Sequence, residues 1–108
     1  PLGGVPATLL TMADDARAML NKALAGLVSR DPSINLQLKT EDDRLDRGYE
    51  RLLAEMFVAM QADPAIVEPG TYLLWVGHNI ERIGDRATNI GEYVEYIVRG
   101  VVSSRERS

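Results

Sequence analysis

The stretch TYLLWVGHNIERIGDRATNIGEYVEYIVR (residues 71–99) decides the fold of this 108-residue chain. Its apolar side chains recur at alternating intervals of three and four residues, as one face of a long helix requires. They are Leu73, Val76, Ile80, Ile83, Ala87, Ile90, Val94 and Ile97. This heptad seam predicts packing against nearly antiparallel helices at shallow crossing angles.

A row of glycines lies seven residues apart beside this seam: Gly70, Gly77, Gly84 and Gly91. A glycine inside a helix costs about 1 kcal/mol relative to alanine. The row therefore predicts that another helix approaches the backbone closely there.

Two further helices are predicted before this one. The first covers residues 7–29, with a core face of Leu9, Met12, Ala16, Met19, Leu20, Ala23 and Leu27. The second covers residues 33–62, with a core face of Leu38, Leu45, Tyr49, Leu52, Met56, Phe57 and Met60. Asp31 before Pro32 predicts the break between them, and ADPAIVEPG (62–70) predicts a turn with one short helical piece. With no strand-period segment, we expect an all-α, up-down-up three-helix bundle.

The composition of the chain argues against several classes of function. A net charge of −4 and no basic stripe argue against a nucleic-acid partner. The chain has no cysteine, no apolar run long enough for a membrane helix and no signal peptide, which favours a cytoplasmic protein. Residues 1–4 are interpreted as the remnant of a cleaved tag, residues 5–100 as the bundle and residues 101–108 as a flexible tail.

Charged side chains follow one face of the third helix: His78, Glu81, Asp85 and Glu92. They lie opposite the seam, so we expect them to face outward. Like charges at helical spacing repel by a few tenths of a kcal/mol. A divalent cation would reverse that cost, because hard cations prefer several carboxylate oxygens.

The second helix offers a matching pair, Asp42 and Asp46, with Asp43 beside them. Antiparallel packing would bring this pair level with Glu81 and Asp85. Four carboxylates from two helices could then hold Fe, Mn, Mg or Ca, among which the ligand types do not choose. Arginines interleave with the third-helix acids, so a merely solvated, solubilising face stays an alternative.

Catalytic motifs are missing from the sequence, so we do not expect an enzyme. A histidine phosphotransfer bundle using His78 is a second alternative. Glu81, one turn further on, would repel the incoming phosphoryl group. A helical interaction module without any ligand is the third.

The segment NIERIGDRATNIGEYVEYIVRG (79–100) resembles the PhoU family of phosphate-signalling proteins. The match rests on ERIGD (81–85), followed by Asn89, Ile90 and Glu92. It extends to DDRLD (42–46) and ADP (62–64). The resemblance implies two side-by-side three-helix bundles that can carry surface clusters of iron or other divalent metals. It makes Asp42, Asp46, Glu81 and Asp85 the metal ligands. The supporting positions are Asp43, His78, Asn89 and Glu92.

The resemblance also implies a non-enzymatic, cytoplasmic negative regulator of phosphate uptake. Such a protein connects the ATPase of a phosphate ABC transporter with a sensor histidine kinase and keeps the phosphate-starvation response off. The chain has room for one bundle, interpreted as the C-terminal repeat. Apolar surface meant for the other repeat could then form a homo-oligomer, with the glycine row as one candidate contact.

Overall fold

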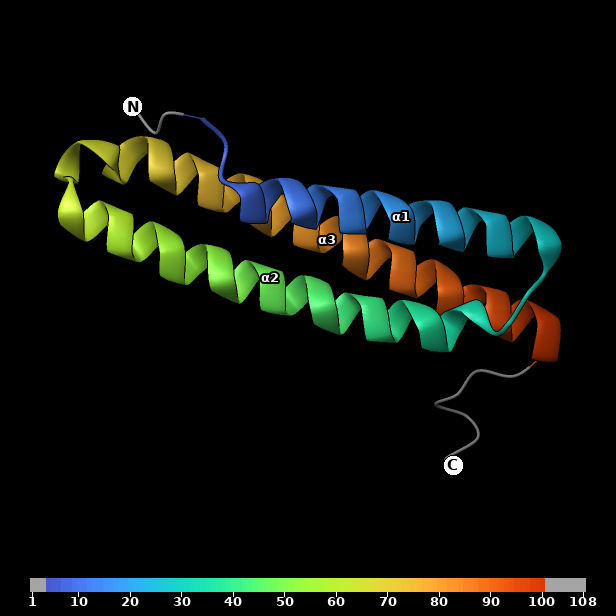
Figure 1. Cartoon of the computed structure of the whole chain (residues 1–108). Helices are drawn as coiled ribbons and strands as arrows, with labels where there is room; N and C mark the ends of the chain where they lie inside the picture. The colour runs from blue at the N-terminus through green and yellow to red at the C-terminus, as the bar shows by residue number, and fades with distance from the viewer. Residues whose placement is uncertain (1–3, 101–108) are drawn as a thin grey trace.

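Three long helices form the protein, as the sequence predicted. The computed structural model describes residues 4–100 and contains α1 (Ala7–Ser29), α2 (Ile34–Ala62), the short 3₁₀ helix η1 (Pro64–Ile66) and α3 (Val67–Arg99). The long helices run side by side in an up-down-up bundle (Figure 1). The predicted tail (101–108) and the first three residues of the predicted tag remnant lie outside the described residues.

The turn between α1 and α2 is built as predicted. Arg30 ends α1 in the left-handed backbone conformation, with φ of 57°. The Asp31 carboxylate then accepts hydrogen bonds from the backbone N–H and the hydroxyl of Ser33, at 3.0 and 2.7 Å. These local bonds hold the chain reversal that Pro32 begins.

The start of the third helix was predicted wrongly. The short helical piece is present as η1, whose Ala65 N–H donates to the Asp63 side chain. The helix then begins at Val67 rather than at residue 71. Pro69 is tolerated because it lies in the first turn, where backbone N–H groups have no partner within the helix.

The glycine row faces α2, and the predicted close approach is confirmed. A Cβ atom added to Gly77 would lie 2.7 Å from Leu52 Cδ2, and one added to Gly84 would lie 2.5 Å from Leu45 Cδ2. Gly91 stands in the same relation to Leu38, at 2.8 Å. The three leucines are fully buried because the glycines leave room for them. The row is therefore used inside the bundle and is not a surface for self-association.

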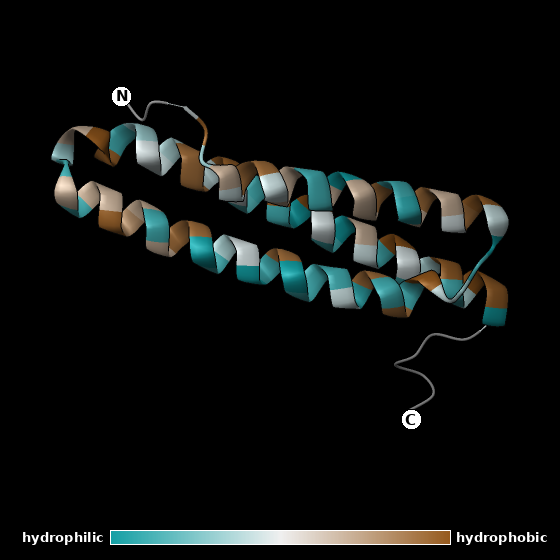
Figure 2. Cartoon of the chain, viewed as in Figure 1, coloured by the Kyte–Doolittle hydropathy of each residue, from teal (hydrophilic) through white to brown (hydrophobic). Residues whose placement is uncertain are grey.

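Several predicted core positions are wrong. On α3, Val76, Ile83 and Ile97 are 46%, 42% and 53% exposed. Leu27 of α1 and Phe57 of α2 are exposed as well. Because glycines occupy the side of α3 that meets α2, the bulky seam residues lie at its outer edge beside α1. Hydrophobic and polar positions alternate along every helix in Figure 2.

An apolar groove of about 240 Å³ runs along this outer edge. Leu20 of α1 and Ile80 and Ile83 of α3 are among its lining residues. Across residues 4–100, no helix combines the length and the apolar character needed to cross a membrane.

Replacing Gly77 with Leu should lower the free energy of unfolding by about 2–3 kcal/mol, since the new side chain must displace Leu52 and the Tyr49 ring. Urea denaturation followed by circular dichroism measures this change. Asn79→Leu, on the exposed side of the same helix, is the matched control and should leave stability nearly unchanged. Equal stability of the two variants would contradict the close packing described here.

Candidate metal-binding site between α2 and α3

Four carboxyl groups meet where α2 and α3 pack together. Asp42 and Asp46 lie one turn apart on α2, and Glu81 and Asp85 lie one turn apart on α3. The antiparallel arrangement places the Asp42 carboxyl close to that of Asp85, and the Glu81 carboxyl close to that of Asp46. The structure thus brings the two predicted acidic pairs level with each other.

The orientation of this cluster differs from the prediction. Asp42, Asp46 and Glu81 are half-buried and only Asp85 is exposed, so the acids border the helix interface instead of facing away from it. The reason lies in the glycine row. Glu81 is about 40° around the helix from Gly77, because each residue turns the helix by about 100°. A face centred on the glycines therefore carries Glu81 toward α2.

Two of the carboxyl groups have strongly raised pKa values. Burial raises the pKa of Asp42 to about 6, with further contributions from the charges of Asp46 and Asp85. Burial likewise raises the pKa of Glu81 to about 7, assisted by its hydrogen bond to Asp46 and by the nearby charges. The raised pKa values favour a shared proton within each close pair, Asp42 with Asp85 and Glu81 with Asp46. Such a proton would relieve the repulsion between the two carboxyl groups of a pair.

One oxygen of Asp42 has no hydrogen-bond partner. Its Oδ1 atom is buried, and a Cβ on Gly84 would lie only 3.2 Å away from it. Leaving a buried acceptor unpaired costs about 1–3 kcal/mol. A bound cation would satisfy this oxygen, which makes Asp42 the strongest single indication of a ligand.

The donor set fits a hard cation, because it consists of carboxylate oxygens. The arrangement of the side chains is not that of a formed site. Within residues 4–100, no group of three or more His, Cys, Asp or Glu side chains is placed to hold a metal ion together. The carboxyl groups lie in two separate pairs, Asp42 with Asp85 and Glu81 with Asp46. Their side chains must rotate before a third carboxyl group can contact the same ion.

The predicted supporting residues differ in their relation to the cluster. Asp43 is exposed, and its charge contributes to the raised pKa of Asp42. Asn89 and Glu92 are exposed further along α3. His78 is also exposed, with its ring centroid 6.3 Å from that of Tyr49. No contact in the described part of the chain distinguishes His78 as a phosphoryl acceptor.

Tyr49 borders the site, although the sequence analysis assigned it only to the core. Its hydroxyl donates to the Leu74 carbonyl oxygen at 3.5 Å. Burial and the Glu81 charge raise the pKa of Tyr49. Its position three residues after Asp46 was the available signal, since residues at that spacing are neighbours on a helix.

The protein is an all-α three-helix bundle with paired acidic residues on its second and third helices. The model of the PhoU domain matches residues 9–94, and the chain belongs to this family. No solved structure matches it significantly.

Curated relatives are longer than this chain. It is 36% identical over 96 residues to the phosphate-specific transport system accessory protein PhoU homolog of Rhizobium meliloti, covering 89% of this chain and 40% of the relative. The protein of the same name from Pseudomonas putida is 36% identical over 81% of this chain and 34% of its own length. The protein of the same name from Synechocystis is 38% identical over 85% of this chain and 41% of its own length. The chain therefore spans between 34% and 41% of the length of these relatives.

The raised pKa values predict how stability depends on pH. Folding raises the pKa of Asp42 and Glu81 above the ordinary value near 4. Their contribution is fully present below about pH 4 and is lost as pH rises through about 6 and about 7. Without metal, we expect the free energy of unfolding to fall by about 1–2 kcal/mol between about pH 5 and pH 7.5, after discounting for solvent screening.

Urea unfolding with a chelator present measures this change. Glu81→Gln should lose about half of the pH dependence, because glutamine keeps a donor toward Asp46 without ionising. Glu92→Gln, an exposed position on the same helix, should behave like the parent. Identical pH profiles for the parent and Glu81→Gln would contradict the assignment.

Proposed function

We propose that this domain regulates phosphate uptake and phosphate-starvation signalling as a negative regulator. The support is the membership in the PhoU family together with the four paired carboxyl groups at Asp42, Asp46, Glu81 and Asp85. The relatives bear the name of an accessory protein of a phosphate-specific transport system. The same system is the proposed setting of this chain.

The proposed mode of action is that of a cytoplasmic, non-enzymatic adaptor. It contacts the ATPase of a phosphate ABC transporter on one side and a sensor histidine kinase on the other. An adaptor changes its partner only by binding one conformational state better than another. The exposed apolar edge of α1 and α3 offers area for such contacts. Pull-down with each purified partner tests this part, and failure to retain either one would contradict it.

A divalent or iron cation is the proposed ligand of the acidic cluster. Asp42, Asp46, Glu81 and Asp85 would hold it, and Asp43 would add negative charge at the rim. The cation would supply positive charge among the crowded carboxyl groups, and it would satisfy the unpaired Asp42 oxygen. Ligands must lose their protons to bind a metal, so uptake should weaken as the pH falls.

Metal content gives the direct test of this ligand. The protein is loaded with Fe, Mn or Mg, freed of unbound ion and assayed for metal by elemental analysis. The parent should retain metal, and Glu81→Gln/Asp85→Asn should lose most of it. The control Glu55→Gln/Glu68→Gln removes the same charge from exposed positions outside the cluster and should retain the parental amount. Absence of metal from the parent would refute the proposed metal site.

A further inference from the structure

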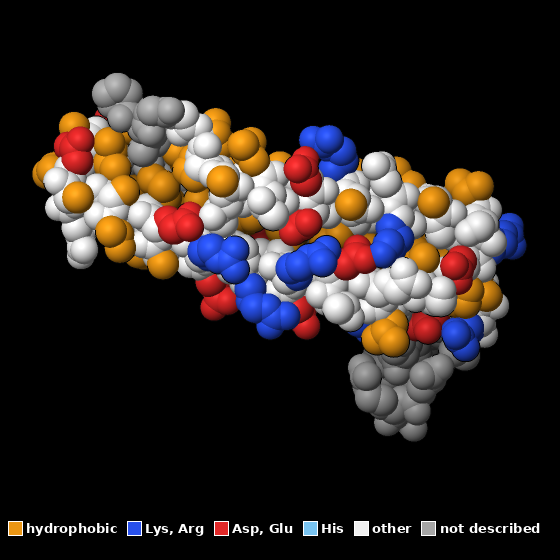
Figure 3. Space-filling model, viewed as in Figure 1, with side chains coloured by type: hydrophobic (Ala, Val, Ile, Leu, Met, Phe, Trp, Pro, Cys, Tyr) orange, Lys and Arg blue, Asp and Glu red, His pale blue; other side chains and the backbone are white. Residues whose placement is uncertain are grey.

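Three arginines of α2 gather on the side of the helix that meets α1. The acids Asp42 and Asp46 border α3, whereas Arg44, Arg47 and Arg51 line a groove against α1. Thr8, Thr11 and Asp15 of α1 form the facing wall. We call this hollow of about 230 Å³ the arginine groove. Figure 3 shows several Lys and Arg side chains over the middle of this face, with Asp and Glu side chains among them.

The floor of the arginine groove is apolar and closely packed. It is formed by Gly48 of α2 and by Met12 of α1, which is 1% exposed. A Cβ added to Gly48 would lie 3.1 Å from Met12 Cγ, so the two helices meet tightly there. Because Gly48 has no side chain, the space between the surrounding arginines stays open.

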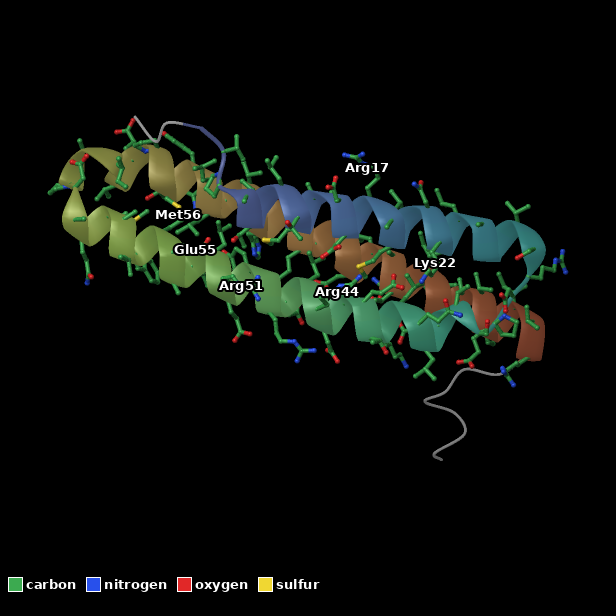
Figure 4. All side chains as sticks on the ribbon, viewed as in Figure 1. Arg17, Lys22, Arg44, Arg51, Glu55 and Met56 are labelled. Atoms are coloured by element: carbon green, nitrogen blue, oxygen red, sulfur yellow. The ribbon has the colours of Figure 1, made fainter. Side chains whose placement is uncertain are left out.

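Most hydrogen-bond donors of the groove are unused by the protein. Arg44 lies 3.7 Å from Asp15, measured between Nε and Oδ2, which is a long contact between an exposed guanidinium and a half-buried carboxylate. Arg47 and Arg51 have no carboxylate within 4.0 Å among residues 4–100. Figure 4 labels Arg44 and Arg51 on the middle of α2. Guanidinium groups bind carboxylates through two parallel hydrogen bonds, so this row suits oxyanions.

The threonine hydroxyls point to the same chemistry. Elsewhere in the bundle, the hydroxyls of Thr40, Thr71 and Thr88 donate to carbonyl oxygens of their own helix. Thr8 and Thr11 make no such bond within the described part of the chain. Their hydroxyls therefore stay available as donors on the wall opposite the arginines.

The length of the groove distinguishes between possible ligands. Seven residues separate Arg44 from Arg51, which is about 10 Å along a helix. One small ion cannot contact both ends of such a row with good geometry. Several carboxylates spaced along one polypeptide segment can contact both ends of the row. The chain as a whole has a net charge of −4, so attraction of an acidic partner must come from this local cluster.

We propose that the arginine groove is a docking site for an acidic segment of a partner protein, whose Asp or Glu carboxylates bind Arg47 and Arg51. Arg44 binds a further carboxylate by exchanging its loose contact with Asp15. The threonine hydroxyls complete the donor set. This site is separate from the acidic cluster and does not depend on metal there.

A titration followed by nuclear magnetic resonance tests the proposal. The probe is a hexaglutamate peptide, acetylated and amidated at its ends, added to the ¹⁵N-labelled chain at low ionic strength. We expect amide shifts concentrated at residues 8–15 and 44–51. Arg47→Gln/Arg51→Gln should weaken binding at least about tenfold, since two charge-assisted contacts are lost. The control Arg82→Gln/Arg86→Gln removes the same charge from exposed positions on α3 and should change the Kd less than about twofold.

Three results would overturn the proposal. One is an equal loss of affinity in both double variants, which would mean unspecific attraction. Another is the absence of peptide-induced shifts in the groove. The third is saturation of the same amides by pyrophosphate at lower concentration than by the peptide, which would make this a site for a small oxyanion. Circular dichroism of each variant establishes that the bundle is folded in every comparison.

Discussion

The close contact between the glycine row of α3 and the leucines of α2 is the interaction on which the rest of the structure depends. Gly77, Gly84 and Gly91 let Leu52, Leu45 and Leu38 reach the backbone of α3. Dense packing of this kind makes an interior sensitive to the addition of a single side chain. It also fixes the register of the two helices, and the register decides which acidic residues become partners.

The number of helices and the level of the acidic pairs could be predicted from the sequence. Helical periodicity and the Asp31–Pro32 break were sufficient for the first. The relative position of the two acidic pairs followed from antiparallel packing of the second and third predicted helices. The rotation of α3 could not be predicted, because glycines add nothing to a hydrophobic pattern. Bulky residues such as Val76 and Ile83 therefore suggested a core direction displaced from the real one. The start of α3 was missed because the proline and glycine at positions 69 and 70 locally indicate a turn.

The electrostatic character of α2 follows from its position between two different helices. Toward α3 it presents Asp42 and Asp46, and partial burial raises the pKa of Asp42 to about 6. Toward α1 it presents arginines that line an open groove. A molecule with an overall negative charge thus carries a surface of each sign on one helix.

Gly84 serves the packing and the acidic cluster at once. Its missing side chain makes room both for Leu45 and for the buried oxygen of Asp42. A change at any of these three positions alters what the other two can accept, so their substitutions should be non-additive. Over evolutionary time such a trio is expected to vary jointly or not at all. The geometry of the core thereby restricts which substitutions the acidic cluster can accept.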